Sequence, residues 1–140
     1  MNKKILAFVY DGHKFLALRN NPQDPIHGGD FWLTVTGSLH EKETDKEAVS
    51  REIKEETNLE TKEIFYLNWN SIYSWQKRDQ YEKNYIAFVE NKPIKLNEEN
   101  IEYEWLNLKD FITRITWKLD KAELKKVLEK AIKNNCSLNR

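Results

Sequence analysis

The segment Gly37–Leu59 reads GSLHEKETDKEAVSREIKEETNL and holds the most informative pattern in the chain. Thr44, followed three residues later by Glu47, forms a capping box, which predicts that a helix begins near Thr44. We expect this helix to end near Asn58, because asparagine tolerates the left-handed backbone conformation that closes many helices. The acidic run inside the helix is therefore on a regular scaffold, and its side chains can be assigned to faces.

The acidic residues of this helix fall partly on the side that faces the core. At about 100° per residue, Val49 and Ile53 mark the buried arc of the helix. Glu52 and Glu56 lie within that arc, and Glu55 lies at its edge. The opposite arc, which we expect to face solvent, holds Lys46, Ser50, Lys54 and Thr57.

Carboxylates that converge in a partly buried place raise each other's pKa unless a cation is present. Divalent metals satisfy such oxygen ligands, and Mg²⁺ with bridging phosphates is the commonest case. Arg51 at the edge of the group can orient one carboxylate, and Glu43 is placed to pair with Arg51. A charged helical run is more often a solvated face, so helix geometry alone leaves a metal site and a solvated helix open.

Composition limits the class of protein. The chain has 140 residues, which fits one domain spanning residues 1–140. Lys+Arg and Asp+Glu number 23 each, so the formal net charge is zero, which argues against a polybasic nucleic-acid binder. Cys136 is the only cysteine, which excludes an intrachain disulfide and favours a reducing, cytoplasmic location. No apolar run approaches the roughly 18–20 residues of a membrane span.

The rest of the chain reads mainly as strands. Asp11-Gly12 between two apolar runs predicts a hairpin, and the long loop 20–30 is a candidate substrate loop. A second helix is expected at Leu119–Asn134 from its helical period. The expected strands are Ile5–Tyr10, Lys14–Arg19, Phe31–Val35, Thr61–Trp75, Gln80–Glu90 and Ile101–Leu106, with a turn at Gln76–Asp79. Two helices packed on a mixed sheet place the chain in the α+β class.

The segment Gly37–Leu59 resembles the Nudix box of the Nudix hydrolases. That box has a glycine, five residues, a glutamate, seven residues, and then Arg-Glu-aliphatic-x-Glu-Glu-x-Gly-aliphatic. Here Gly37, Glu43 and the run from Arg51 keep every spacing, and the one departure is Asn58 in place of the final glycine. The resemblance implies an α/β/α sandwich around a mixed sheet. It also implies hydrolysis of a nucleoside diphosphate linked to another group.

The resemblance also implies site residues. Glu52, Glu55 and Glu56 would bind Mg²⁺, or Mn²⁺ as an alternative, or activate the attacking water. Arg51 and Glu43 would hold the loop and the helix in place, and Thr36 or Gly37 would offer a backbone carbonyl to the metal. A further acidic residue is expected from a later loop, where Glu99 is the best match. Catalytic roles would fall on Glu52, Glu55, Glu99 and Arg51, with Glu52 or Glu99 as the general base.

A narrower resemblance concerns Phe31–Ser38, which reads FWLTVTGS. This form is similar to the bacterial dihydroneopterin triphosphate pyrophosphatases, which also act on dATP and other nucleoside triphosphates. By that likeness Arg19 and Thr36 would contact substrate, and Trp117 would belong to a late substrate-contacting segment. Trp32 or Tyr73 would stack on a purine or pterin ring, although Trp32 is equally well explained as a core residue.

We therefore expect an enzyme that splits a nucleoside or pterin triphosphate into monophosphate and pyrophosphate. Diadenosine polyphosphates, nucleotide sugars and oxidised nucleotides are alternative substrates, because the box does not distinguish them. A binding module without catalysis is a third alternative. The expected partner is the small-molecule substrate, with no nucleic acid and no membrane, and the protein would be a monomer or a homodimer.

Overall fold

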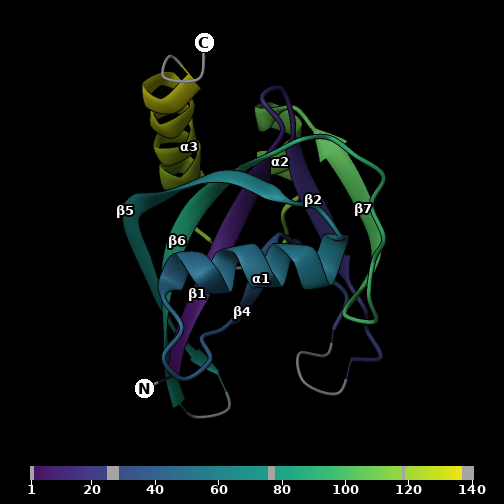
Figure 1. Ribbon diagram of the computed structural model, residues 1–140, viewed down its shortest axis with the longest axis vertical. Helices are drawn as coiled ribbons and strands as arrows, with labels where there is room; N and C mark the ends of the chain where they lie inside the picture. Colours follow the sequence, from purple (N-terminus) through teal and green to yellow (C-terminus); the bar gives the residue numbers. More distant parts are fainter. Residues whose placement is uncertain (1, 25–28, 76–77, 118, 137–140) are drawn as a thin grey trace.

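A computed structural model describes residues 2–24, 29–75, 78–117 and 119–136. Within these residues the chain forms strands and helices in an interleaved order (Figure 1). In chain order they are β1 Asn2–Tyr10, β2 Phe15–Asn20, β3 Trp32–Leu33, β4 Val35–Ser38, α1 Asp45–Thr57, β5 Thr61–Trp75, β6 Arg78–Val89, β7 Asn100–Leu106, α2 Leu108–Arg114 and α3 Lys121–Cys136.

The strands form one mixed sheet that divides into two arms at β1. The main path runs β3-β2-β1-β6-β5, with β7 joined to β2 and β4 joined to β1. β1 and β6 are parallel, and the other pairs are antiparallel. β1 pairs with β2 at Tyr10, but with β4 from Lys4 to Ala7. Because β1 bonds to different neighbours at its two ends, the arm containing β2, β3 and β7 separates from the arm containing β4.

Helices cover both faces of the sheet, as expected of an α/β/α sandwich (Figure 1). Ala48, Val49 and Ile53 of α1 are fully buried in one apolar cluster. On the other face, Phe111 of α2 and Leu124 of α3 belong to a second cluster. Alternate residues of the central strands supply the two clusters, because successive side chains of a strand point to opposite faces.

The boundaries of α1 follow the local signals in the sequence. The Glu47 amide donates to the Thr44 hydroxyl oxygen at 3.2 Å, and the Thr44 amide donates to the Glu47 carboxylate at 2.9 Å. The predicted capping box is therefore confirmed. Asn58 closes the helix with φ of 67°, in the left-handed region. Asparagine here does the work of the glycine that the box pattern expects.

Three details of the predicted fold were wrong. The described residues contain a third helix, α2, which the apolar pattern did not predict. This helix has only seven residues and a single buried side chain, Phe111. The strand expected at 31–35 is two short strands separated at Thr34, whose hydroxyl donates to the Ala7 carbonyl at 2.8 Å. Thr57 is buried rather than solvent-facing, because its hydroxyl donates to the Ile53 carbonyl at 2.6 Å.

Two predictions fall partly on residues that are not described. In the turn expected at Gln76–Asp79, residues 76 and 77 lie outside the described part of the chain, whereas 78 and 79 belong to β6. The loop 20–30 likewise includes residues 25–28, which are not described. Across the described residues, no helix has both the length and the apolar character needed to cross a membrane.

Candidate active site

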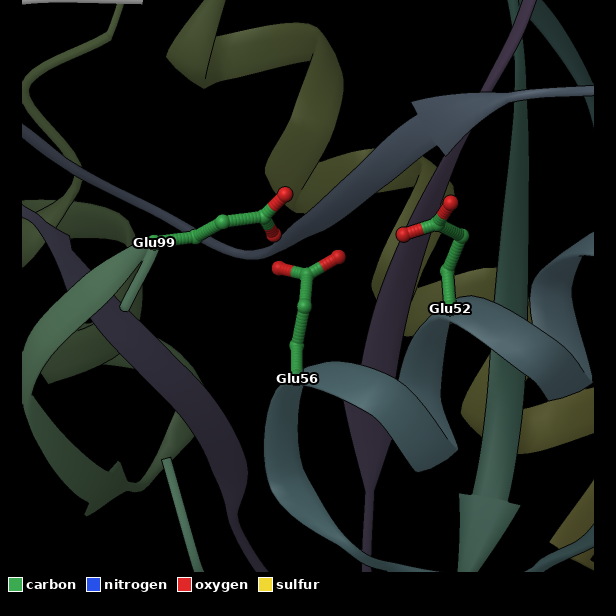
Figure 2. A group of neighbouring side chains, drawn as sticks. All are labelled: Glu52, Glu56 and Glu99. Carbon is green, nitrogen blue, oxygen red and sulfur yellow. The ribbon is translucent and has the colours of Figure 1, made fainter. Parts of the chain in front are cut away.

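Three carboxylates converge where α1 approaches the segment before β7. Figure 2 shows Glu52 and Glu56 extending from α1, with Glu99 directed at Glu56 from the other side. One carboxylate oxygen from each lies within 4.8 Å of the others. The Glu99 amide donates to the Asn97 side chain at 3.0 Å, and its carbonyl accepts from the Asn21 amide at 2.9 Å. These bonds fix the position from which Glu99 reaches α1.

The electrostatics of the group call for a cation. Glu56 is 2% exposed, and its Oε2 atom has no hydrogen-bond partner among the described residues. Burial raises the pKa of Glu56 well above its ordinary value, and the neighbouring Glu99 and Glu52 raise it further. Burial likewise raises the pKa of Glu99, and Glu52 adds to the effect. An all-oxygen donor set with an unpartnered buried oxygen fits a hard divalent cation such as Mg²⁺.

Arg51 holds this region together through three of its nitrogen atoms. Nε and Nη2 donate to the two carboxylate oxygens of Glu43 at 2.7 and 2.9 Å, a bidentate pair. Nη1 donates to Glu52 Oε1 at 2.7 Å, and Nη2 also donates to the Ser38 carbonyl at 2.9 Å. Arg51 therefore ties α1 to β4 and to the connecting loop, and it fixes the direction in which Glu52 points.

The Glu43–Arg51 pair predicts how acid destabilises the protein. Hydrogen bonds from Arg51, and then from the His40 amide, lower the pKa of Glu43 from 4.5 to about 2. The stabilisation is therefore complete above pH 4.5 and is lost as the pH falls toward 2. We expect Glu43→Gln to reduce the free energy of unfolding at pH 7. At pH 3 the difference in the free energy of unfolding between the variant and the wild type should be smaller. Urea titrations at the two pH values measure this. An equal loss of free energy of unfolding at the two pH values would contradict the lowered pKa of Glu43. The raised pKa values of Glu56 and Glu99 affect the wild type and the variant equally, so they cancel in this comparison.

Gly37 is needed because Glu52 occupies the space beside it. A Cβ atom built on Gly37 would lie 2.2 Å from Glu52 Cδ and 2.4 Å from Oε1. Carbon atoms pack at about 3.5–4.0 Å, so a side chain at this position would displace either the Glu52 carboxylate or β4. The glycine thus allows β4 to approach the carboxylate closely.

A cavity opens beside the three carboxylates, between the two arms of the sheet. Phe31 and Trp117 form one part of its wall, with ring centroids 4.6 Å apart. The Trp32 amide donates to the Thr116 hydroxyl at 2.8 Å, and the Thr116 amide donates to the Trp32 carbonyl at 3.1 Å, which anchors the segment carrying Trp117. The cavity is lined by Leu18, Asn20, Phe31, Leu33, Thr34, Thr36, Glu56, Glu82, Glu99, Asn100 and Trp117.

The structure brings some predicted site residues to this cavity and places others elsewhere. Thr36, Glu56 and Glu99 line it. Glu55 lies outside the three-carboxylate group, is half-exposed, and has a carboxylate oxygen 3.3 Å from Arg51 Nη1. Its role as a metal ligand or catalytic residue, like that of the Gly37 carbonyl, stays a prediction.

The predicted substrate contacts Arg19 and Trp32 are not among the described residues that line the cavity. Arg19 donates to both oxygens of Asp30, at 2.8 and 2.7 Å, and also pairs with Glu102. Trp32 lines a separate cavity, where the Arg114 guanidinium lies 4.9 Å from the centre of the Trp32 ring. The side chain of Tyr73 lies outside the described part of the structure.

Glu82 and Asn100 are among the cavity residues that the sequence did not predict as site residues. Asn100 donates to Glu56 Oε1 at 3.3 Å, a contact between segments far apart in the chain that no local pattern encodes. Glu82 lies on the same face of β6 as Gln80 and Asn84, but strand alternation alone does not indicate which face lies beside the cavity, because both faces continue into the core.

Comparison with known proteins agrees with this architecture. A curated dihydroneopterin triphosphate diphosphatase from Haemophilus influenzae is 25% identical over 91% of this chain and 87% of that protein. The E. coli dihydroneopterin triphosphate pyrophosphohydrolase structure superposes with a TM-score of 0.69 at 20% identity, covering 94% of this chain and 95% of that one. A C. elegans Ap4A hydrolase structure gives a TM-score of 0.71 at 23% identity, covering 93% and 94%.

An α/β/α sandwich with carboxylates converging beside a cavity is an arrangement that can bind a divalent cation and a phosphate group together. Residues 2–128 match the model of the NUDIX domain. The chain therefore belongs to the Nudix family of hydrolases, enzymes that act on phosphoric anhydride bonds.

Proposed function

We propose that the protein is a Mg²⁺-dependent pyrophosphohydrolase that cleaves dihydroneopterin triphosphate or a (deoxy)nucleoside triphosphate such as dATP to monophosphate and pyrophosphate. The observation that carries this proposal is the position of Glu56 and Glu99. They lie in the three-carboxylate group and also line a cavity with an aromatic wall. A phosphate chain can thus meet the acidic group while its ring meets Phe31 and Trp117.

The chain's own residues would divide the work. A divalent cation held by Glu52, Glu56 and Glu99 would neutralise phosphate charge and lower the pKa of the attacking water. Of the two expected general bases, Glu52 and Glu99, Glu99 would be the better proton acceptor, because Glu52 is already paired with Arg51. The remaining contribution is positioning, on which phosphoryl and nucleotidyl transfer chiefly depend.

The substrate proposal draws support from the relative in Haemophilus influenzae, which is named for dihydroneopterin triphosphate. The C. elegans neighbour is named for Ap4A, and its comparable TM-score keeps diadenosine polyphosphates as the second candidate. A small-molecule triphosphate substrate and a single cysteine also suit a reducing cytoplasm.

The test is a parallel assay with Mg²⁺ on dihydroneopterin triphosphate, the nucleoside triphosphates and diadenosine tetraphosphate, with all phosphate products separated. We expect pyrophosphate and a monophosphate in equal amounts from a triphosphate, and no turnover when EDTA removes the metal. Turnover of the dinucleotide alone would move the proposal to the second candidate. No turnover of any substrate, by a protein shown to be folded, would contradict it.

A further inference from the structure

One face of β6 carries a row of buried polar side chains next to the apolar core. Gln80, Glu82 and Asn84 are each at most 3% exposed. They lie on the same face as Ile86 and Phe88, because alternate residues of a strand share a face. Burying polar groups is costly unless they are hydrogen-bonded. Gln80 Oε1 and Asn84 Oδ1 have no partner within the described part of the chain. A row of this kind is not explained by core packing.

Glu82, at the centre of this row, reaches the cavity. It lines the same space as Phe31 and Trp117, yet it is not part of the group formed by the three converging carboxylates. The Thr36 hydroxyl donates to Glu82 Oε2 at 3.2 Å, which holds the carboxylate in place. Lys4 is its register partner on parallel β1 and is 9% exposed, so a basic residue occupies the adjacent position on the same face. The cavity is thus also lined by the carboxylate of Glu82, which does not belong to the three-carboxylate group.

We propose that Glu82 reads the edge of the substrate's ring and selects a heterocycle that presents a ring N–H beside an exocyclic amino group. Guanine and pterin have this edge. An ionised carboxylate accepts hydrogen bonds and donates none, so its two oxygens match two parallel N–H donors. This inference rests on the proposed function, and it names the substrate class of the same site.

Adenine matches this carboxylate less well, so dATP would be the poorer of the proposed substrates. Its amino group lies beside a ring nitrogen that is an acceptor, and the lone pair of that nitrogen would face a carboxylate oxygen. Glutamine, in contrast, offers one donor and one acceptor and matches adenine in a bidentate arrangement. Phe31 and Trp117 contact a flat ring without distinguishing purines, so the discrimination falls to Glu82.

A different role for Glu82, as a cation ligand or a general base, makes a separable prediction. Loss of such a group would lower turnover of every triphosphate by the same factor, because all of them carry the same phosphate chain. Loss of an edge-reading group instead changes the ratio between substrates. The ratio of kcat/KM values is therefore the decisive quantity.

The experiment compares kcat/KM for GTP, ITP, ATP and dihydroneopterin triphosphate in the wild type, Glu82→Gln and the matched control Glu90→Gln. Glu90 is an exposed residue just after β6 that pairs with Lys62 and Lys92. In Glu82→Gln we expect the GTP to ATP ratio to fall about thirtyfold, with dihydroneopterin triphosphate falling like GTP. Glu90→Gln should keep the wild-type ratio. An unchanged ratio in Glu82→Gln, or an equal loss on all four substrates, would overturn the proposal.

Two further measurements apply if Glu82→Gln does not fold or if the wild type hydrolyses no triphosphate. If Glu82→Gln does not fold, as judged by circular dichroism, the wild-type series decides. ITP lacks the amino group of GTP and should fall between GTP and ATP, whereas ATP equal to GTP would overturn the proposal. If the wild type hydrolyses no triphosphate, the proposed function fails by itself. In that case the affinities of the wild type for non-hydrolysable GTP and ATP analogues, measured by calorimetry, still test the role of Glu82. Equal affinities for the two analogues would overturn the proposal.

Discussion

Replacement of Glu56 by glutamine is expected to lower kcat about a thousandfold in the presence of Mg²⁺ while leaving the protein folded. The substitution keeps the shape of the side chain but removes a charge from a group whose oxygens lie within 4.8 Å of one another. Steady-state kinetics with a triphosphate substrate measure the loss. Full activity in this variant would show that the three-carboxylate group does not bind the catalytic metal.

The same variant should be more stable than the wild type without metal. Because burial and like charges raise the pKa of Glu56, its ionised form is destabilising in the folded protein at pH 7. Neutral glutamine removes that cost, so in EDTA we expect a Tm a few degrees higher. Mg²⁺ should raise the Tm of the wild type and have little effect on the variant. Glu60→Gln, on an exposed residue that pairs with Lys54, is the matched control and should behave as wild type.

Gly37→Ala is expected to reduce activity about a hundredfold through a single methyl group. That methyl would lie 2.2 Å from Glu52 Cδ, so either the carboxylate or β4 has to move. A displacement of about 1 Å at a catalytic group is enough for such a loss. We also expect a loss of about 1–3 kcal/mol in the free energy of unfolding, as is usual for overpacking.

The control for this variant is Ser38→Ala on the same strand. Ser38 is exposed, and it contacts Arg51 through its backbone carbonyl, which the substitution keeps. Near-wild-type kinetics and stability are therefore expected. Full activity in Gly37→Ala would show that the close approach of β4 to Glu52 is not needed for activity.

The acidic helix could be predicted in detail because its signals are local. The capping box, the helical period and the left-handed Asn58 each depend on residues within a few positions, and all three agree with the structure. Glu52 and Glu56 were placed on the buried side by angle alone, and both are buried. Thr57 was misplaced because a threonine can satisfy its hydroxyl on the helix backbone and then tolerate burial.

The cavity could be predicted only in part, because it is assembled from segments far apart in the chain. The family likeness led to Glu99, which the structure brings to Glu56. The aromatic wall depends on the pairing of Trp32 with Thr116, eighty-four positions away in sequence. Glu82 requires knowing which side of β6 faces the gap between the sheet's arms, and that gap follows from β1 changing partners along its length.

Among the described residues, the contacts of Arg51 are confined to the part of the molecule that supports Glu52 and do not reach the aromatic wall of the cavity. The residues that hold Glu52 in place lie within one short stretch, from Ser38 to Glu52, and Arg51 joins them through hydrogen bonds. The far end of the cavity is made from separate strands, whose side chains have no bond to Arg51 among those described. Substitutions there can change which molecule is accepted without disturbing the ion pairs behind the chemistry. Such a division separates the residues that hold Glu52 from those that would contact the ring of the substrate.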